Sequence, residues 1–354
     1  MSKEIPIEEF LELSRETPLI DVRTPAEYEQ AHIPGALNLP LFTNQEREHV
    51  GTVYKKQGKI HAVNIGLEYV GPKLTQFTKT ALSLNSNKLL LHCWRGGMRS
   101  KSMAWLLETV GLECLILEGG YKSYRAHIRE RLSEPRNIVL LGGFTGSGKT
   151  DLLAVLEQNG KQVVDLEGLA HHKGSAFGAI GQKPQPSTEM FENLLWEKIS
   201  ALDPNRTIWV EDESHNVGKV FIPEPFWVQM RNSPVVIVEA PFQNRLERLI
   251  RDYGNYPVDL LVASIRKIEK RLGYDKCKEA VDACLAGDLE KAAQISLLYY
   301  DKAYQSQLDN RFGEKLAAMP RVAFCTGSPL LAVEQLRVIE QKNEEYYNEK
   351  RDQQ

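Results

Sequence analysis

The sequence predicts an α/β protein built on two parallel sheets and ending in a helical region. Three observations favour this fold class. Short, continuous apolar runs recur over the first 240 residues, as expected of strands buried on both faces of a parallel sheet. Two glycine-containing loops, at residues 92–100 and 143–150, follow such runs and precede helical patterns. From about residue 253 onward, the spacing of apolar residues is helical.

The composition is that of an ordinary globular protein. The chain has 354 residues, of which 42% are hydrophobic and 26% charged, so it is long enough for two domains with cores of their own. The acidic amino terminus lacks the pattern of a signal peptide and no apolar run could span a membrane, so we expect a cytoplasmic protein without a membrane partner. The five cysteines include no Cys-x-x-Cys pair, which predicts neither a disulfide framework nor a zinc site.

Cys93 lies where a nucleophile would be expected. Residues 89–91 are predicted to form a buried strand, and Cys93 follows at its carboxyl end, where the sheet opens and backbone amides become available to a ligand. Residues 100–110 continue as a predicted helix whose positive end faces the loop. Both features would favour the thiolate of Cys93 over the thiol.

The residues around this cysteine strengthen the prediction. Gly96 and Gly97 let the chain curl so that successive N–H groups point inward, and Arg95 and Arg99 add positive charge. The thiolate thus favoured is the species that attacks sulfur, selenium or phosphorus. The plainer alternative is a packing residue at a strand end, but a packing cysteine has no use for two arginines and two glycines.

The region before the cysteine resembles the rhodanese domain, a family that moves sulfur or selenium as a cysteine-bound chalcogen. The resemblance is carried by residues 19–28 and 32–40 and extends over roughly residues 5–132. It implies that Asp21 and Arg23 form a structural ion pair and take no part in the chemistry.

One departure from the common sulfurtransferase loop is informative. From Cys93 to Arg99 the spacing is Cys-x5-Arg, one residue longer than in that loop and equal to that of rhodanese-like phosphatases. The longer loop is expected to hold a tetrahedral phosphorus group, either a phosphoester or a phosphate that carries another chalcogen.

A second domain is predicted to begin where residues 133–137 break the preceding helix. A buried strand at 138–141 leads into residues 143–150, which match Gly-x4-Gly-Lys-Thr without a mismatch and precede a helix, the context that supports a phosphate-binding P-loop. The glycines let amides approach a di- or triphosphate, the lysine neutralises it, and the threonine suits Mg²⁺. The predicted diphosphate-binding residues are Gly143, Gly146, Ser147, Gly148, Lys149 and Thr150.

Three further strands are predicted at residues 162–165, 207–210 and 235–239. Three acidic residues, 211–213, follow the second of these strands, and the sequence leaves open which of them would hold a magnesium-bound water, or whether a metal is required. No adenine-reading motif is identifiable, so the binding of a nucleoside triphosphate at the P-loop also stays open.

The charge pattern offers a path for RNA without making the protein basic overall. The net charge is −3, which by itself does not indicate a nucleic-acid partner. Local arginine clusters nevertheless lie at the junction between the domains and on a predicted helix, where solvated helix faces are an equal alternative. The predicted tRNA contacts are Arg125, Arg129, Arg131, Arg245, Arg248 and Arg251.

Taken together, the motifs resemble one family over nearly the whole chain, the tRNA 2-selenouridine synthases. Members replace sulfur by selenium at C2 of the wobble 2-thiouridine, take selenium from selenophosphate, and attach a geranyl group from geranyl diphosphate. The resemblance therefore implies tRNA, these two small molecules and the selenophosphate-producing enzyme as partners, with no tightly bound cofactor and Mg²⁺ left open. Its carriers are residues 46–54, 62–66, 93–100, 143–150, 171–178 and 211–214.

This resemblance assigns roles to the predicted regions. Residues 1–132 are expected to form a rhodanese-like domain, residues 133–252 the core of a P-loop NTPase-like domain with a parallel sheet, and residues 253–354 a helical region packed on that core, with a polar tail that frays from residue 340. Cys93 would carry selenium as a selenide, and the P-loop would hold the diphosphate leaving group. The expected selenophosphate loop consists of Trp94, Arg95, Gly96, Gly97, Met98 and Arg99.

Two other function classes fit parts of the same pattern. A rhodanese-like phosphatase fused to a small-molecule kinase would use the same Cys-x5-Arg spacing and the same P-loop. A regulatory module that binds phosphorylated ligands without turning them over would tolerate loss of Cys93. The sequence gives neither the tRNA identity elements, nor the isoprenoid chain length, nor the oligomeric state.

Overall fold

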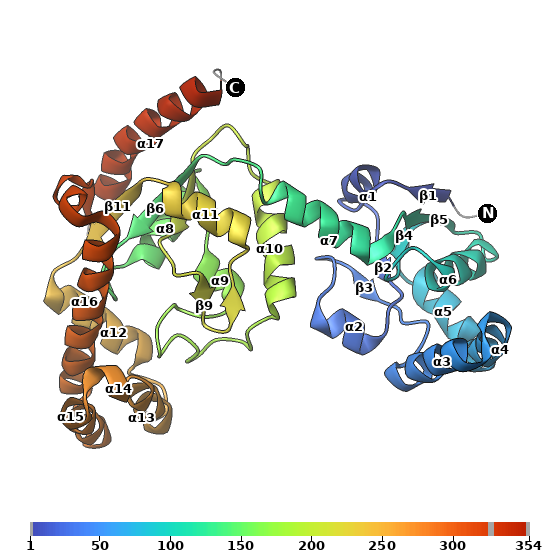
Figure 1. The fold of residues 1–354 in the computed structure, drawn as a ribbon, viewed down its shortest axis with the longest axis horizontal. Helices are drawn as coiled ribbons and strands as arrows, with labels where there is room; N and C mark the ends of the chain where they lie inside the picture. Colours follow the sequence, from blue (N-terminus) through green and yellow to red (C-terminus); the bar gives the residue numbers. More distant parts are fainter. Residues whose placement is uncertain (1–2, 325–328, 352–354) are drawn as a thin grey trace. The chain divides into compact units, whose positions relative to one another are not determined.

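The computed structural model describes residues 3–324 and 329–351, and the chain forms two compact units (Figure 1). Unit 1 comprises Met1–Ser133 together with Glu192–Glu197, and unit 2 comprises Glu134–Phe191 and Lys198–Gln354. The two segments of unit 1 are brought together in space although about 60 residues of sequence separate them.

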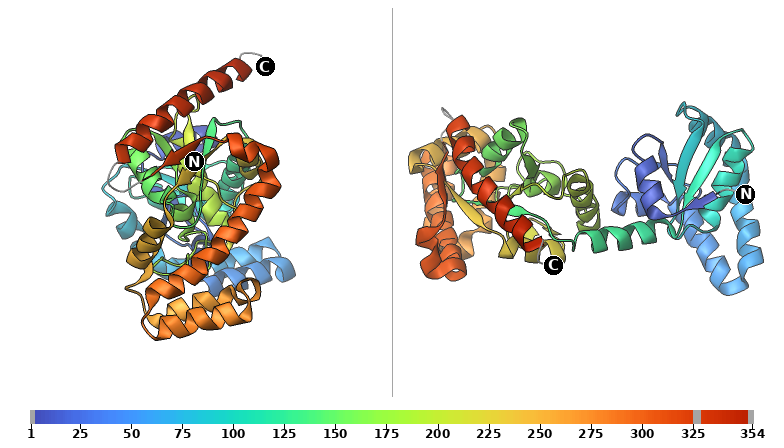
Figure 2. Two further views of the ribbon diagram at one scale, coloured as in Figure 1. Left: turned by 90° about the vertical axis from the view of Figure 1, so that its left-hand side faces the viewer. Right: turned by 90° about the horizontal axis from the view of Figure 1, so that it is seen from above.

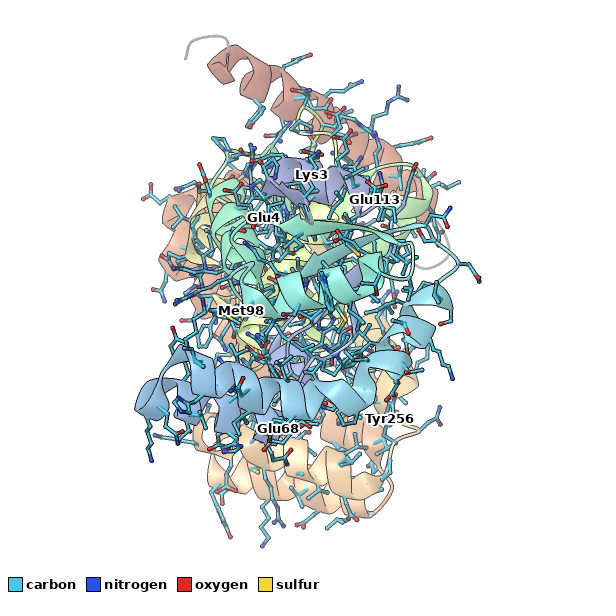
Figure 3. The ribbon with its side chains drawn as sticks, turned by 90° about the vertical axis from the view of Figure 1, so that its right-hand side faces the viewer. Lys3, Glu4, Glu68, Met98, Glu113 and Tyr256 are labelled. Atoms are coloured by element: carbon cyan, nitrogen blue, oxygen red, sulfur yellow. The ribbon has the colours of Figure 1, made fainter. Side chains whose placement is uncertain are left out.

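Unit 1 is built on a five-stranded parallel sheet in the order β1-β5-β4-β2-β3. Figure 3 labels Lys3 and Glu4 of β1 and Glu113 of β5, the edge pair of this sheet. The strands are β1 (Lys3–Ile5), β2 (Leu19–Asp21), β3 (Leu37–Asn38), β4 (Lys88–His92) and β5 (Glu113–Leu117). The helices are α1 (Ile7–Leu13), α2 (Pro25–Gln30), α3 (Asn44–Gln57), α4 (Lys59–Val70), α5 (Leu74–Leu82), α6 (Met98–Glu108) and α7 (Gly120–Arg131), with a 3₁₀ turn η1 (Gly71–Lys73) before α5.

The central strand β4 positions the first candidate site. Leu89 and Leu91 are fully buried and pack with Met103 and Leu107 of α6 in one core cluster. Burial of such side chains contributes on the order of 2 kcal/mol each. The packing therefore fixes both the strand that ends before Cys93 and the helix that begins after it.

Unit 2 carries a second five-stranded parallel sheet, in the order β12-β11-β6-β8-β7. Its strands are β6 (Ile138–Gly142), β7 (Gln162–Val164), β8 (Ile208–Glu211), β11 (Val235–Glu239) and β12 (Arg321–Ala323), and β9 (Asn216–Val217) pairs with β10 (Val220–Phe221) in a separate hairpin. The helices before residue 254 are α8 (Lys149–Gln158), α9 (Leu166–Ala170), α10 (Thr188–Ser200), α11 (Glu224–Asn232) and α12 (Phe242–Tyr253).

A helical group follows in unit 2 and packs against α12 (Figure 2). It consists of α13 (Val258–Lys267), α14 (Glu269–Leu272), α15 (Tyr274–Leu285) and the long α16 (Leu289–Phe312), followed by a 3₁₀ turn η2 (Gly313–Ala318), strand β12 and α17 (Pro329–Arg351). Buried side chains such as Leu261 of α13, Cys284 of α15 and Ile295 of α16 form a core of their own.

The predicted α/β fold with two parallel sheets is confirmed, and one local prediction is wrong. The helical region is interrupted by β12, which pairs with β11 at the sheet edge; its three residues are too few to show a period in the sequence. Residues 340–351, which the sequence marks as polar enough to fray, continue helix α17 to Arg351. Among the described residues, no helix has the length and apolarity needed to cross a membrane. Cys325 lies outside the described residues.

Candidate active sites

The first candidate site is the loop that follows β4. Cys93 comes directly after the strand and is 3% exposed, and its carbonyl oxygen accepts a hydrogen bond from the N–H of Tyr121 at 2.8 Å. The helix predicted over residues 100–110 begins two residues earlier, at Met98, so its amino end lies closer to the sulfur than expected. The sulfur is therefore held at the junction of strand, loop and helix, as the sequence predicts.

Hydrogen-bond donors surround the sulfur of Cys93. The N–H of Gly97 donates to Sγ at 3.3 Å, and the hydroxyl of Ser100 donates at 3.4 Å. Burial alone would raise the pKa of Cys93, but the Ser100 hydroxyl, the amides of Arg95 and Ser100, and the charge of Arg99 together hold that pKa below its ordinary value. The loop therefore favours the thiolate.

Two glycines allow the close packing of this loop. Gly96 has φ +63°, and a Cβ there would lie 2.8 Å from the carbonyl oxygen of Leu117. Gly120 has φ +62°, and a Cβ there would lie 2.4 Å from both the Cys93 carbonyl oxygen and the Gly96 nitrogen. A side chain at either position would collide with backbone, so the shape of the loop depends on glycine.

The charged residues of the loop are placed differently from one another. The guanidinium of Arg99 makes a bidentate pair with Glu27, with contacts of 2.6 and 3.2 Å. Arg95 is exposed, as are Trp94 and Met98, which are 38% and 52% exposed. Arg95 is therefore the loop arginine whose side chain is most accessible to an incoming anion, whereas Arg99 is held by a carboxylate.

A buried ion pair lies next to the loop. Arg23 and Asp21 are 1% and 0% exposed and make contacts of 2.6 and 2.9 Å, and the Arg23 guanidinium lies 3.9 Å from the centre of the Tyr121 ring. Within the described part of the chain, neither ring nitrogen of buried His92 has a hydrogen-bond partner, and burial lowers the pKa of His92 to about 4, so this ring is neutral near pH 7. The scaffold role predicted for Asp21 and Arg23 fits this placement.

The second candidate site is the loop between β6 and α8. Gly143, Gly146 and Gly148 all have positive φ angles, and the Lys149 ammonium donates to the carbonyl oxygen of Gly143 at 3.0 Å. Ser147 is 1% exposed, and its hydroxyl has no hydrogen-bond partner within the described chain. Glycine amides and a lysine at a helix amino terminus form the environment that stabilises phosphate oxygens.

Two arginines of α12 donate hydrogen bonds to backbone carbonyl groups of this loop. Arg245 is 5% exposed, donates to the carbonyl oxygen of Thr145 at 3.1 Å, and pairs with Asp301 of α16 at 2.6 Å. Arg248 is 7% exposed and donates to the carbonyl oxygen of Gly146 at 2.5 Å. Arg248 also pairs with Asp151 at 3.1 Å, so both side chains face the P-loop and are held by carboxylates, and neither is placed as the predicted tRNA contact requires.

The other arginines predicted to contact tRNA differ in their exposure and in their ion pairs. Arg129 is exposed and Arg131 half-buried. Arg251 is exposed but pairs with Asp252 at 2.8 Å. Arg125 is 6% exposed and bonds Glu192 within unit 1, so its charge is already occupied in the fold.

A pair of carboxyl groups borders the P-loop. Glu167, at the start of α9, accepts a hydrogen bond from the Thr150 hydroxyl at 3.2 Å and shares a hydrogen bond with Glu213. Burial raises the pKa of Glu213 to about 8, with a further contribution from the charge of Glu167 and an opposing one from Lys149. Such a pair holds one proton near neutral pH and can exchange it with a substrate.

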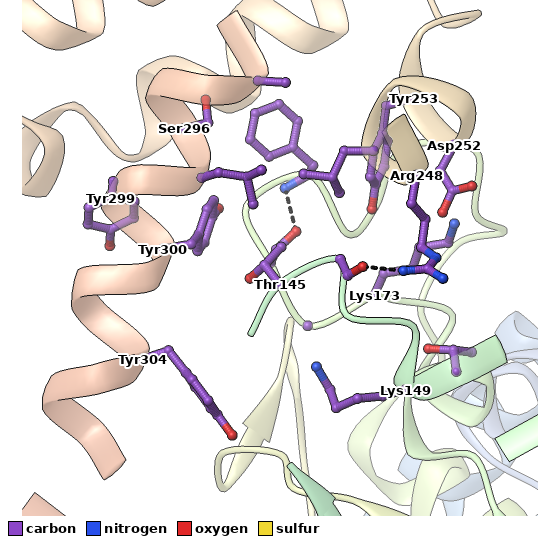
Figure 4. A pocket seen from close by; sticks show the side chains of 18 of the residues that line it. Thr145, Lys149, Lys173, Arg248, Asp252, Tyr253, Ser296, Tyr299, Tyr300 and Tyr304 are labelled. Atoms are coloured by element: carbon purple, nitrogen blue, oxygen red, sulfur yellow. Dashed lines mark hydrogen bonds between the residues drawn. The ribbon is translucent and has the colours of Figure 1, made fainter. Parts of the chain in front are cut away.

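These groups line one wall of a cavity of about 470 Å³ in unit 2 (Figure 4). The P-loop, Glu167 and Glu213 form its polar end. The loop at residues 173–178 and helices α12, α13 and α16 form most of the remaining wall, where apolar side chains such as Phe177, Leu261 and Leu297 stand among polar ones such as Lys173, Asp252 and Ser296.

The sequence did not indicate the contribution of α16 to this site. Tyr304 accepts a hydrogen bond from the N–H of Gly143 at 2.6 Å, and Tyr300 accepts one from the N–H of Ala176 at 3.0 Å. The tyrosines lie more than 120 residues from their partners, so only the fold reveals the contact. Within the described ranges, no group of three or more histidine, cysteine, aspartate or glutamate side chains is arranged to hold a metal ion.

Comparison with known proteins finds matches to both units. Residues 136–319 match the family model of the tRNA 2-selenouridine synthase AAA domain, and residues 7–127 match that of the rhodanese-like domain. A tRNA 2-selenouridine synthase from Nitrosomonas europaea is 40% identical over 248 residues, which cover 67% of this chain. The matched region spans 64% of that relative, a little under two thirds of its length.

Two solved structures resemble part of the chain. The N-terminal domain of a Clostridium difficile 630 protein is 44% identical, covers 36% of this chain and 98% of its own, and has a TM-score of 0.34. A Saccharomyces cerevisiae homologue of single-domain rhodanese and the Cdc25 phosphatase catalytic domain is 14% identical, covers 36% of this chain and 83% of its own, and has a TM-score of 0.23. These scores are low, so the assignment rests on the family models and the curated relative. The chain belongs to the tRNA 2-selenouridine synthase family.

Proposed function

We propose that this chain is a tRNA-modifying transferase that replaces sulfur by selenium in the wobble 2-thiouridine. It would use selenophosphate and proceed through an S-geranylated intermediate made from geranyl diphosphate. The observation that carries the proposal is the combination of two sites on one chain: a loop that favours a cysteine thiolate, and a P-loop that opens into a cavity lined in part by apolar side chains.

The cavity supports an isoprenoid diphosphate as the ligand of the P-loop. The P-loop presents glycine amides and Lys149, which suit a diphosphate, and the wall beyond it includes aliphatic and aromatic side chains such as Leu261 and Phe177, which suit a hydrocarbon chain. The two regions together favour an amphiphilic substrate.

In the first step, the C2 sulfur of 2-thiouridine attacks C1 of geranyl diphosphate. The C1–O bond breaks and its electron pair leaves with the diphosphate, whose charge Lys149 and the loop amides stabilise. The uridine loses its N3 proton in this step, so a base is needed. The pair Glu167–Glu213 borders the P-loop and is the group that we assign to take this proton.

In the second step, selenium replaces the geranylated sulfur. The thiolate of Cys93 attacks the phosphorus of selenophosphate, the P–Se bond breaks, and hydrogen selenide anion leaves; water then hydrolyses the cysteinyl phosphate. The selenide attacks C2 of the modified uridine and expels geranylthiol, which takes the selenide's proton. This route differs from the predicted selenide on Cys93, because joining a thiolate to selenide requires a two-electron oxidant that neither substrate supplies.

The proposal is tested by reconstitution. A tRNA anticodon stem-loop with wobble 2-thiouridine is incubated with the full chain, geranyl diphosphate and selenophosphate, and its nucleosides are analysed by mass spectrometry. We expect S-geranylated uridine without selenophosphate and selenouridine with both substrates. Release of phosphate from simple phosphoesters without any change to the RNA would instead favour the phosphatase alternative.

A further inference from the structure

One face of α16 extends along the whole cavity. The residues of this helix that line the cavity run from Leu289 to Gln307 and fall on one side of the helix, among them Ala293, Ser296, Tyr300 and Tyr304. In Figure 4, Ser296, Tyr300 and Tyr304 follow one another along α16, and Lys149 lies at the Tyr304 end. The helix therefore runs from the phosphate end of the cavity to its far end.

The two ends of this face differ in character. Near the P-loop, Tyr304 is fixed by its hydrogen bond to Gly143, and its ring lies 5.2 Å from that of Phe144. Farther along the helix the cavity side chains become small, at Ser296 and Ala293. Leu289, in the first turn of α16, lies at the far end of the cavity, near Gly254.

We propose that this face of α16 acts as a ruler for the length of the isoprenoid chain, with Ser296 and Ala293 as the positions that determine specificity. The inference rests on the proposed function, since it requires a diphosphate in the P-loop. One helix turn rises about 5.4 Å, roughly the length of one extended isoprene unit, so successive turns beyond Tyr304 correspond to successive units. Ser296 lies about 12 Å along the axis from Tyr304 and Ala293 about 16 Å, at 1.5 Å per residue.

A larger side chain at a given helix turn should exclude isoprenoid chains that extend beyond that turn. With Ser296→Phe, a ring enters the cavity at the second turn, and transfer of the ten-carbon geranyl group should fall about tenfold or more relative to the five-carbon dimethylallyl group. With Ala293→Phe, the ring enters farther away, so geranyl transfer should persist while transfer of the fifteen-carbon farnesyl group falls. The matched control is Leu298→Phe, because Leu298 belongs to the same helix but is 63% exposed.

The experiment offers the full-length protein an equimolar mixture of dimethylallyl, geranyl and farnesyl diphosphates with the 2-thiouridine stem-loop, and mass spectrometry reads the chain-length distribution. Binding of inorganic diphosphate to each variant shows that the P-loop is still folded, and Ser296→Leu provides a smaller change where the ring disrupts it. The expected result is an ordered shift, with Ser296→Phe giving the shortest products and Leu298→Phe the parent distribution.

Two results would overturn the ruler, and they are distinguishable. If the variants still prenylate with an unchanged distribution, α16 does not set chain length, although the proposed function stands. If the parent transfers no prenyl group of any length while binding inorganic diphosphate, the proposed function fails and the ruler fails with it.

Discussion

The Cys93 loop of unit 1 and the P-loop of unit 2 have the same order of strand, glycine-containing loop and helix, and they differ in the space around the loop. Each follows a buried parallel strand, bends at glycines and leads into a helix. The Cys93 loop closes tightly around a sulfur that is 3% exposed, whereas the P-loop opens into a cavity of about 470 Å³. In the proposed mechanism, the same arrangement of strand, loop and helix holds a nucleophile in one unit and a leaving group in the other.

Breaking the first site should have the largest effect. Cys93→Ser should abolish selenium insertion, because a serine hydroxyl keeps its proton where the loop favours a thiolate, and the loss should be on the order of 10³-fold or more. Geranylation should stay within about twofold of the parent, since it uses only unit 2. The measurement is the ratio of selenouridine to geranylated uridine, and selenouridine at parental levels would disprove the role of Cys93.

Lys149→Ala should lower geranylation and leave the second step, selenium insertion into geranylated RNA, intact. The developing diphosphate charge loses its main counter-charge, which should cost about 2–4 kcal/mol of transition-state stabilisation and lower geranylation 30- to 1000-fold. Conversion of a stem-loop that is already geranylated should be unaffected. Single-turnover rates for the two steps provide the test, and undiminished geranylation would move the diphosphate to another site.

The variant Glu213→Gln tests the pH dependence that the carboxyl pair confers on the P-loop site. Because the pKa of Glu213 is raised to about 8, the folded state keeps its proton at pH values where the unfolded chain has lost it, so the parent loses stability as pH rises from about 4.5 to 8. The glutamine variant cannot ionise there and should be more stable than the parent, by on the order of 1–3 kcal/mol at pH 8 and above and by little at pH 4.

The same variant should slow geranylation, since only Glu167 of the pair remains to take the uridine proton. In the parent the rate should rise with pH through the ionisation of the pair, and in Glu213→Gln that dependence should flatten. Denaturant unfolding and geranylation rates at pH 5 to 9 provide the two measurements. A variant with the parent's stability and pH profile would remove Glu213 from the proton transfer.

The smallest effect is expected for the RNA contact. If the exposed side chain of Arg129 and the half-buried one of Arg131 contact phosphates, their replacement by glutamine should lower the salt dependence of tRNA binding by about 0.7–0.9 log units per contact for each tenfold change in salt. Binding titrations at several salt concentrations would measure this, with Arg15→Gln in unit 1 as a comparison. An unchanged slope would show that this helix does not touch tRNA.

The two sites differed in how much of them the sequence could predict. Both loops were predictable because their residues are contiguous and the chemistry follows from their types. The cavity was not, because Tyr304 meets Gly143 only through the fold, across 161 residues of sequence. Arg245 and Arg248 show the same limit from the other side: an arginine-rich helix has the same sequence signature whether it faces RNA or, as here, the P-loop.

A transfer between two variants tests the division of labour most directly. Cys93→Ser protein is given the 2-thiouridine stem-loop and geranyl diphosphate, the RNA is purified, and Lys149→Ala protein then receives it with selenophosphate. We predict that this sequence of incubations yields selenouridine, while either variant alone, given both substrates, yields little or none. Failure of the relay, with each variant folded and the geranylated RNA confirmed by mass, would contradict the assignment of the two steps to separate sites.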